Sequence, residues 1–158
     1  MRTLIAGFGN VLRGDDGFGV DVLRRLGERG AASKMVELLD VGTGGIRLAQ
    51  ELINPYDRLI ILDATTRGGV PGTVYVLAID GVEAAREIDM HTTIPSSALS
   101  VAKALGALPR EIFLVGCEPA SVDDLCVGLS PEVDRAADEA VHRVQELMTA
   151  NGALARGR

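Results

Sequence analysis

The stretch TLIAGFGNVLRGDDGFG, residues 3–19, decides the fold of this chain. It begins with a short apolar run, residues 3–8, which predicts a β-strand followed by a glycine-rich turn. Apolar side chains then recur at helical spacing, at Phe18, Val22 and Leu26, and this spacing predicts an amphipathic helix. A strand that passes through a tight turn into a helix is a building unit of α/β folds.

Further apolar runs predict four more strands, at residues 35–39, 59–62, 73–79 and 112–115. The run LIIL at 59–62 is apolar throughout, which is typical of a strand buried on both faces. The segment that follows it is too short for a helical crossover, which needs about a dozen residues or more. We therefore expect the strand at 73–79 to run antiparallel to its neighbours, at an edge of the sheet.

Periodic apolar residues predict two helices between these strands. The first has Ile46, Ala49 and Ile53 on its apolar face and ends before a proline. The second is expected to begin at a Ser97 cap and to stop at Gly106.

A last helix is predicted from Ser130 at the N-cap, Pro131 at the first helical position and an apolar stripe that follows them. The whole pattern predicts an α/β three-layer sandwich: a five-stranded, mostly parallel sheet with one antiparallel edge strand and helices on both faces. Residues 1–150 are expected to form a single domain, and residues 151–158 a flexible C-terminal tail.

The composition of the chain excludes several classes of function. Its 158 residues carry 16 Lys and Arg against 22 Asp and Glu, a net charge of −6, so binding to a nucleic-acid backbone is not expected. Two cysteines cannot form a disulfide framework, which favours a cytoplasmic protein. No apolar run approaches the roughly 18 residues of a membrane span, so membrane insertion is not expected.

Acidic residues follow three of the predicted strands. Asp15 and Asp16 come after the first, Asp40 after the second and Asp63 after the third. Because parallel strands end at the same side of a sheet, these carboxylates should meet there and repel one another unless a cation binds among them. Together with His91, two such carboxylates suit a divalent metal of borderline hardness with open coordination positions. Each residue also has an ordinary interpretation, as a cap or turn residue or, for His91, as an incidental histidine.

Other chemistries fit the sequence less well. A dinucleotide-binding G-x-G-x-x-G motif would have its third glycine where Leu12 stands. No G-x-S-x-G elbow is present, which disfavours a serine hydrolase. Cys117 is interpreted as a small buried residue and His142 as a solvated one.

Six motifs occur in one order along the chain: GFGNVLRGDDGFG, LLDVGTGG, LDA, PGTV, VGCEP and GLSPEV. This order resembles the hydrogenase maturation protease family, the endopeptidases that process nickel-iron hydrogenase large subunits. The resemblance implies an α/β sandwich around a five-stranded, mostly parallel sheet. It also implies a hydrolase that removes a C-terminal extension from the large-subunit precursor after nickel insertion, with the precursor's own nickel as the recognition signal.

The resemblance also implies which residues form the site. The metal-contacting and catalytic positions of the family correspond to Asp16, Asp63 and His91. Asp15 is then expected to orient Asp16 or to act as a base.

The family's D-x-G-T motif corresponds to Asp40, Gly42 and Thr43, which would line the cleft that receives the precursor's tail. The nickel would come from the substrate and would not be bound permanently. This also fits the absence of an HExxH motif, the signature of a resident zinc site.

Two alternatives remain open at this point. The same residues could serve a non-catalytic nickel or assembly chaperone of the large subunit, or an unrelated metal-dependent amidohydrolase. Cleavage of a protein tail distinguishes the protease from both.

Overall fold

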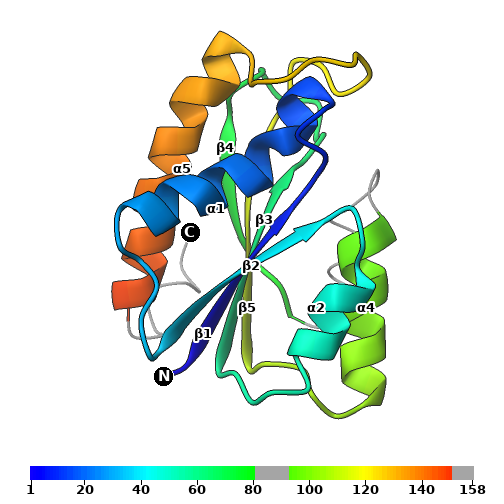
Figure 1. Cartoon of the computed structure of the whole chain (residues 1–158), viewed down its shortest axis with the longest axis vertical. Helices are drawn as coiled ribbons and strands as arrows, with labels where there is room; N and C mark the ends of the chain where they lie inside the picture. Colours follow the sequence, from blue (N-terminus) through cyan, green and yellow to red (C-terminus); the bar gives the residue numbers. More distant parts are fainter. Residues whose placement is uncertain (81–92, 151–158) are drawn as a thin grey trace.

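A five-stranded sheet forms the centre of the computed structural model, which describes residues 1–80 and 93–150 (Figure 1). The strand order is β2-β1-β3-β5-β4. All neighbouring pairs are parallel except β4 and β5, which are antiparallel. The strands are β1 (Thr3–Phe8), β2 (Val36–Gly42), β3 (Arg58–Ala64), β4 (Val74–Ala78) and β5 (Glu111–Cys117). The predicted fold class, including the antiparallel edge strand, is confirmed.

Helices cover both faces of this sheet. One face carries α1 (Phe18–Glu28) and α5 (Pro131–Thr149), and the other carries α2 (Ile46–Glu51) and α4 (Thr93–Ala104) (Figure 1). The side chains of β3 alternate between two hydrophobic clusters. Leu59 and Ile61 pack on the α2 and α4 side, and Ile60 and Leu62 pack on the α1 and α5 side. This alternation confirms that the LIIL run is buried on both faces.

The apolar face predicted for α2 is wrong except at Ala49. Ile46 and Ile53 are exposed, whereas Leu48 and Leu52 are buried together with Ala49. The helix ends at Glu51, so Ile53 lies beyond it. The Leu48–Leu52 pair, four residues apart, takes the inward face instead.

Two element boundaries also differ from the expectation. Helix α4 begins at Thr93, so Ser97 lies inside the helix instead of capping it. Gly106, with a φ of +68°, ends it as predicted. Strand β2 continues through Asp40 to Gly42 because the β1–β2 register shifts after Gly7.

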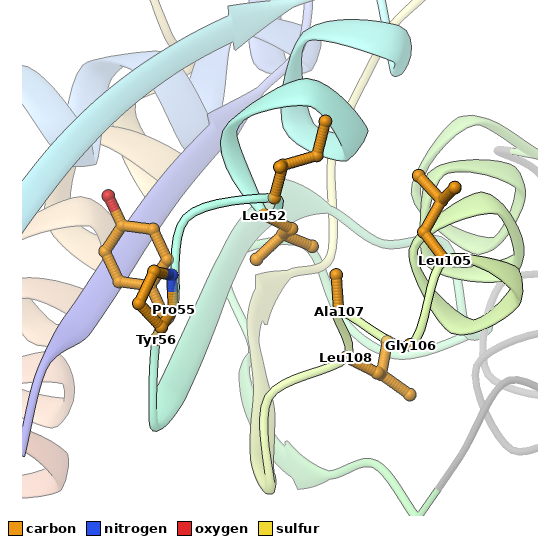
Figure 2. Close-up of a pocket in the computed structure, with 8 residues that line it drawn as sticks. Leu52, Pro55, Tyr56, Leu105, Gly106, Ala107 and Leu108 are labelled. Carbon is orange, nitrogen blue, oxygen red and sulfur yellow. The ribbon is translucent and has the colours of Figure 1, made fainter.

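A pocket of about 450 Å³ lies at the amino end of the parallel strands, beside the C-terminal ends of α2 and α4 (Figure 2). Leu52, Tyr56, Leu105 and Leu108 contribute to its lining. The Tyr56 hydroxyl donates a hydrogen bond to Glu51, and burial raises the pKa of this phenol. Of the predicted site residues that the structure describes, none lines this pocket.

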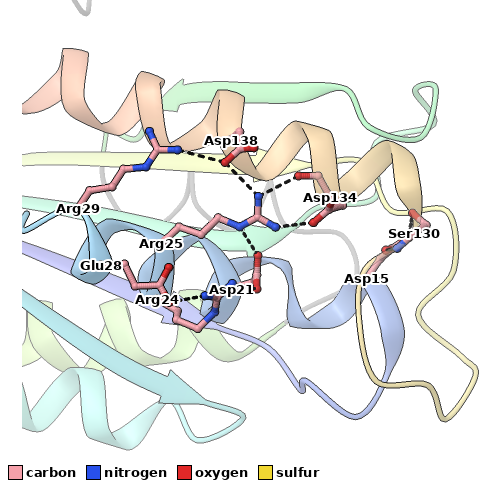
Figure 3. Close-up of polar contacts among 9 residues, drawn as sticks. All are labelled: Asp15, Asp21, Arg24, Arg25, Glu28, Arg29, Ser130, Asp134 and Asp138. Atoms are coloured by element: carbon pink, nitrogen blue, oxygen red, sulfur yellow. Dashed lines mark hydrogen bonds and ion pairs between the residues drawn. The ribbon is translucent and has the colours of Figure 1, made fainter.

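An ion-pair cluster joins α1 to α5 (Figure 3). The Arg25 guanidinium on α1 contacts Asp21 on its own helix and both Asp134 and Asp138 on α5. Because Arg25 is mostly buried, its fork-shaped group is held more firmly than in an ordinary surface pair. The cluster fixes how the two helices lie against each other.

Among the helices that the structure describes, none is long and apolar enough to span a bilayer.

Candidate functional site

Two glycines bring the opening motif onto the carboxyl ends of the strands. A Cβ at Gly19 would lie 2.2 Å from the Leu62 carbonyl oxygen and 2.5 Å from that of Phe8. The first turn of α1 therefore rests directly on the ends of β1 and β3. Gly9 has a φ of +126°, and a Cβ there would lie 1.8 Å from the Asp16 carbonyl oxygen. The turn after β1 can close this tightly only because both positions lack a side chain.

Asp16 lies in the short 3₁₀ helix η1 (Gly14–Gly17), which packs against β3. Its carboxylate is half-buried and accepts a hydrogen bond from the Asn10 N–H at 2.9 Å. The side chain is thus held within the turn that it follows. This places a carboxylate beside the carboxyl end of β3.

Asp63 is the penultimate residue of β3 and is buried. It stands opposite Gly116 of β5 in the parallel ladder. By strand alternation it shares a face with Ile61, on the side of the sheet that α4 covers. The structure therefore brings Asp16 and Asp63 to the same end of the sheet, as predicted from the sequence.

The D-x-G-T residues lie at the end of the neighbouring strand. Asp40 is exposed and pairs in register with Gly7 of β1. Gly42 has a φ of +61°, and its carbonyl accepts a hydrogen bond from the Gly9 N–H at 2.9 Å. This bond ties the D-x-G-T motif to the opening turn and leaves Thr43 exposed beside it.

His91 falls among residues 81–92, outside the described residues. Its predicted role as a ligand therefore stays a prediction. Helix α4, which begins two residues later, starts at the end of the sheet where β1 and β3 finish (Figure 1). Within residues 1–80 and 93–150, no group of three or more His, Cys, Asp or Glu side chains could hold a metal ion.

Asp15 is buried, and both of its oxygens accept hydrogen bonds from the β5–α5 loop. The donors are the N–H groups of Ala120 (2.8 Å), Ser121 (3.3 Å) and Ser130 (2.7 Å) and the Ser130 hydroxyl (2.9 Å). Ser130 occupies the predicted N-cap position of α5, but within the described chain its side chain makes no cap hydrogen bond to the helix. It points to Asp15 instead (Figure 3).

Glu118, directly after β5, is a buried carboxylate that the sequence analysis did not single out. It accepts hydrogen bonds from the Arg67 N–H (2.8 Å), the Gly68 N–H (3.2 Å) and the Tyr75 hydroxyl (2.8 Å). Burial alone would raise the pKa of Glu118, but these hydrogen bonds outweigh it and lower the pKa below its usual value. Glu118 thereby fixes the loop that follows Asp63. The acidic residue of the VGCEP motif was the available signal.

Cys117 is buried beside this carboxylate, as predicted, and the second cysteine, Cys126, is exposed. Burial, together with the nearby charge of Asp15, raises the pKa of the Cys117 thiol to about 12. The thiol therefore stays protonated at neutral pH and behaves as a small apolar side chain. The exposed position of His142 on α5 agrees with its interpretation as a solvated residue.

The chain is similar over almost its whole length to proteins of one family. Residues 20–147 match the sequence profile described as hydrogenase maturation protease. Hydrogenase 2 maturation protease of Escherichia coli is 33% identical over 155 residues, covering 96% of this chain and 93% of that protein. The hydrogenase expression/formation protein HupM of Azotobacter chroococcum is 37% identical over 160 aligned residues, covering 99% of this chain and 76% of that protein.

Solved structures of similar proteins have the same fold as this chain. The hydrogenase maturating endopeptidase HybD from E. coli superimposes with a TM-score of 0.82 at 30% identity, covering 94% of this chain and 92% of that one. The matched profile spans most of the chain, and relatives above 30% identity cover nearly all of it. This chain therefore belongs to the hydrogenase maturation protease family and is an endopeptidase.

Proposed function

We propose that this endopeptidase removes the C-terminal extension of a nickel-loaded [NiFe] hydrogenase large-subunit precursor. Membership of the family supports the reaction class. The observation that supports particular residues is that Asp16 and Asp63, both in motifs that resemble those of the family, lie at the same end of the sheet. A soluble cytoplasmic precursor is the substrate that fits this proposal.

In this proposal the nickel belongs to the substrate, where the precursor's own cysteine thiolates hold it. Asp16, Asp63 and His91 complete its coordination, and they are also the residues on which cleavage depends. Two carboxylates and one imidazole are a donor set that borderline divalent metals accept. The ion can polarise a carbonyl or acidify a water molecule.

Other residues of this chain bind the substrate or position the catalytic residues. Asp40, Gly42 and Thr43, held beside the opening turn by the Gly9–Gly42 hydrogen bond, bind the tail of the precursor. Both oxygens of Asp15 accept hydrogen bonds from the β5–α5 loop, so we assign Asp15 to positioning Asp16 and not to proton transfer. Residues 1–150 act as one α/β peptidase domain.

Intact-mass analysis of the cognate precursor tests the proposal. The precursor is incubated with the protein in two forms, one loaded with nickel and one without nickel. We expect loss of a C-terminal fragment from the nickel-loaded form alone. An unchanged mass for a precursor that metal analysis shows to be nickel-loaded would contradict the proposal and favour a chaperone of the large subunit.

A further inference from the structure

The β5–α5 loop, residues 118–130, is bound along its length to the opening motif. The Gly14 N–H donates to the Cys126 carbonyl at 2.7 Å, and the Cys126 N–H donates to the Leu12 carbonyl at 3.0 Å. Arg13 and Cys126 form an isolated parallel bridge between these two bonds. The buried Asp15 carboxylate holds both ends of the same loop, at Ala120 and at Ser130. The loop is therefore built onto the segment that leads into Asp16.

Two large apolar side chains of this ordered loop are largely exposed, whereas Leu129 at its end packs against the core cluster on the α1 and α5 side. Leu125 is 84% exposed and Val127 is 79% exposed. Across the Arg13–Cys126 bridge, Leu12 is 55% exposed and Val11 is 47% exposed. We call these four residues, Val11, Leu12, Leu125 and Val127, the apolar rim. Single exposed apolar residues are common, but here backbone hydrogen bonds join the two segments that carry all four of them.

The exposed Leu125 and Val127 contribute little to the order of the loop. Fixing a loop costs conformational entropy, and in this loop a buried carboxylate and backbone hydrogen bonds offset that cost. Apolar side chains that are held in place and left in water are typical of a protein interaction site. A surface that is already ordered loses little further entropy when a partner binds to it.

We infer that the apolar rim is the docking surface for the large-subunit precursor, which it contacts through an apolar patch next to the cleaved segment. This inference rests on the proposed function, because it takes the precursor as the protein that must reach Asp16. Leu12 is four residues before Asp16 and lies in the same hydrogen-bonded turn, so a protein that binds at Asp16 comes close to this part of the rim. Asp123 and Asp124 lie exposed next to Leu125, which fits a basic margin on the partner's apolar patch.

The test compares two double variants at opposite ends of the sheet. Leu125→Ser with Val127→Ser removes half of the rim. Ile53→Ser with Leu105→Ser removes two exposed apolar side chains at the amino end. With nickel-loaded precursor, we expect the rim variant to raise KM about tenfold or more while kcat stays within about twofold. The amino-end variant should keep the KM of the wild type.

A binding measurement separates this inference from the proposed function. In an Asp16→Asn background, size-exclusion chromatography with purified nickel-loaded precursor reports complex formation without cleavage. We expect the rim variant to lose the complex and the amino-end variant to keep it. An unchanged KM and an intact complex in the rim variant would overturn the inference, as would a wild-type dimer that this variant abolishes. If the wild type leaves the precursor uncut, the proposed function fails, and the chromatography still decides whether the rim binds.

Discussion

The two ends of the sheet both bury charged side chains, but they satisfy them differently. At the amino end, Arg58 pairs with Glu111 and also donates to the carbonyl oxygens of Leu147 and Ala150, which end α5. At the carboxyl end, Asp15 and Glu118 accept hydrogen bonds from backbone N–H and hydroxyl groups of loops. The amino end therefore joins secondary-structure elements to one another, whereas the carboxyl end orders loops.

This difference separates stability from chemistry in the molecule. A cation that meets a carboxylate and the carbonyls of a helix end stabilises the fold and leaves no group for a ligand. Carboxylates that accept hydrogen bonds from loops leave a negative electrostatic potential at that end of the sheet. They also order the turns to which a substrate would bind. Substitution of Arg58 at the amino end should therefore change the free energy of unfolding, and substitution of Asp16 at the carboxyl end should mainly change activity.

The strongest test of this comparison is Asp16→Asn. We expect processing of the nickel-loaded precursor to fall by about 10²- to 10⁴-fold, the range for a residue on which the chemistry depends. The free energy of unfolding should change little, because the variant keeps an oxygen that can accept the Asn10 hydrogen bond. Single-turnover cleavage assays and urea titration measure the two quantities. Asp138→Asn on α5 is the matched control, and full activity in Asp16→Asn would remove this residue from the site.

The converse test is Arg58→Met at the amino end. We expect the free energy of unfolding to fall by about 3–5 kcal/mol, since Glu111 and the last carbonyls of α5 lose their buried partner. Specific activity should persist below the melting temperature. The control is Arg110→Met, whose largely exposed guanidinium pairs with Asp57 at 3.7 Å and should have no measurable effect. Equal stability of the two variants would contradict the role assigned to Arg58.

Two glycines on α1 test how closely the helix must approach the strand ends. Gly19→Ala should lower the free energy of unfolding by about 2–3 kcal/mol, because its Cβ meets two backbone carbonyls. Gly27→Ala, on the same helix, should raise it by about 0.5–1 kcal/mol, since its Cβ meets only Leu38 Cδ1 at 3.6 Å. Denaturant titrations measure the free energy of unfolding of both variants. Opposite signs for the two substitutions are the expected result, and a neutral Gly19→Ala would show that α1 can move away from the sheet.

The smallest expected effect concerns Glu118→Gln and pH. At pH 7 the variant should be less stable by about 1–3 kcal/mol, because one acceptor oxygen is replaced by a donor. The pKa of Glu118 is lower in the folded chain than its ordinary value of 4.5. This part of the stability is therefore present above pH 4.5 and lost as the pH falls below it. Urea titrations should show that the difference in free energy of unfolding between the variant and the wild type is smaller at pH 3.5 than at pH 7. Glu146→Gln serves as the exposed control.

The strands could be predicted from sequence because each coincides with a local apolar run. The antiparallel direction of β4 followed from the length of one connection. The buried face of α2 could not be predicted in the same way. Ile46 and Ile53 are as apolar as Leu48 and Leu52, and only the position of the helix over the sheet decides which pair is covered.

The candidate site was predictable where it depends on topology and not where it depends on side-chain direction. Parallel strands bring Asp16 and Asp63 to one end of the sheet whatever their rotamers. Ser130 fits a local capping rule, yet its hydroxyl bonds to a residue 115 positions away. Glu118 acts on a loop that comes about 50 residues earlier. No local pattern encodes either partner.

The contacts between Asp15 and Ser130 also bear on synthesis. They join two segments 115 positions apart in the chain, and a domain forms only as its parts leave the ribosome. The opening motif has its full set of hydrogen bonds only once the β5–α5 loop and the first turn of α5 are present. A nascent chain that stops before residue 130 carries Asp16 but not the Ser130 anchor of the turn in which Asp16 lies. The turn that carries Asp16 can therefore gain its full set of hydrogen bonds only after residue 130 has been synthesised.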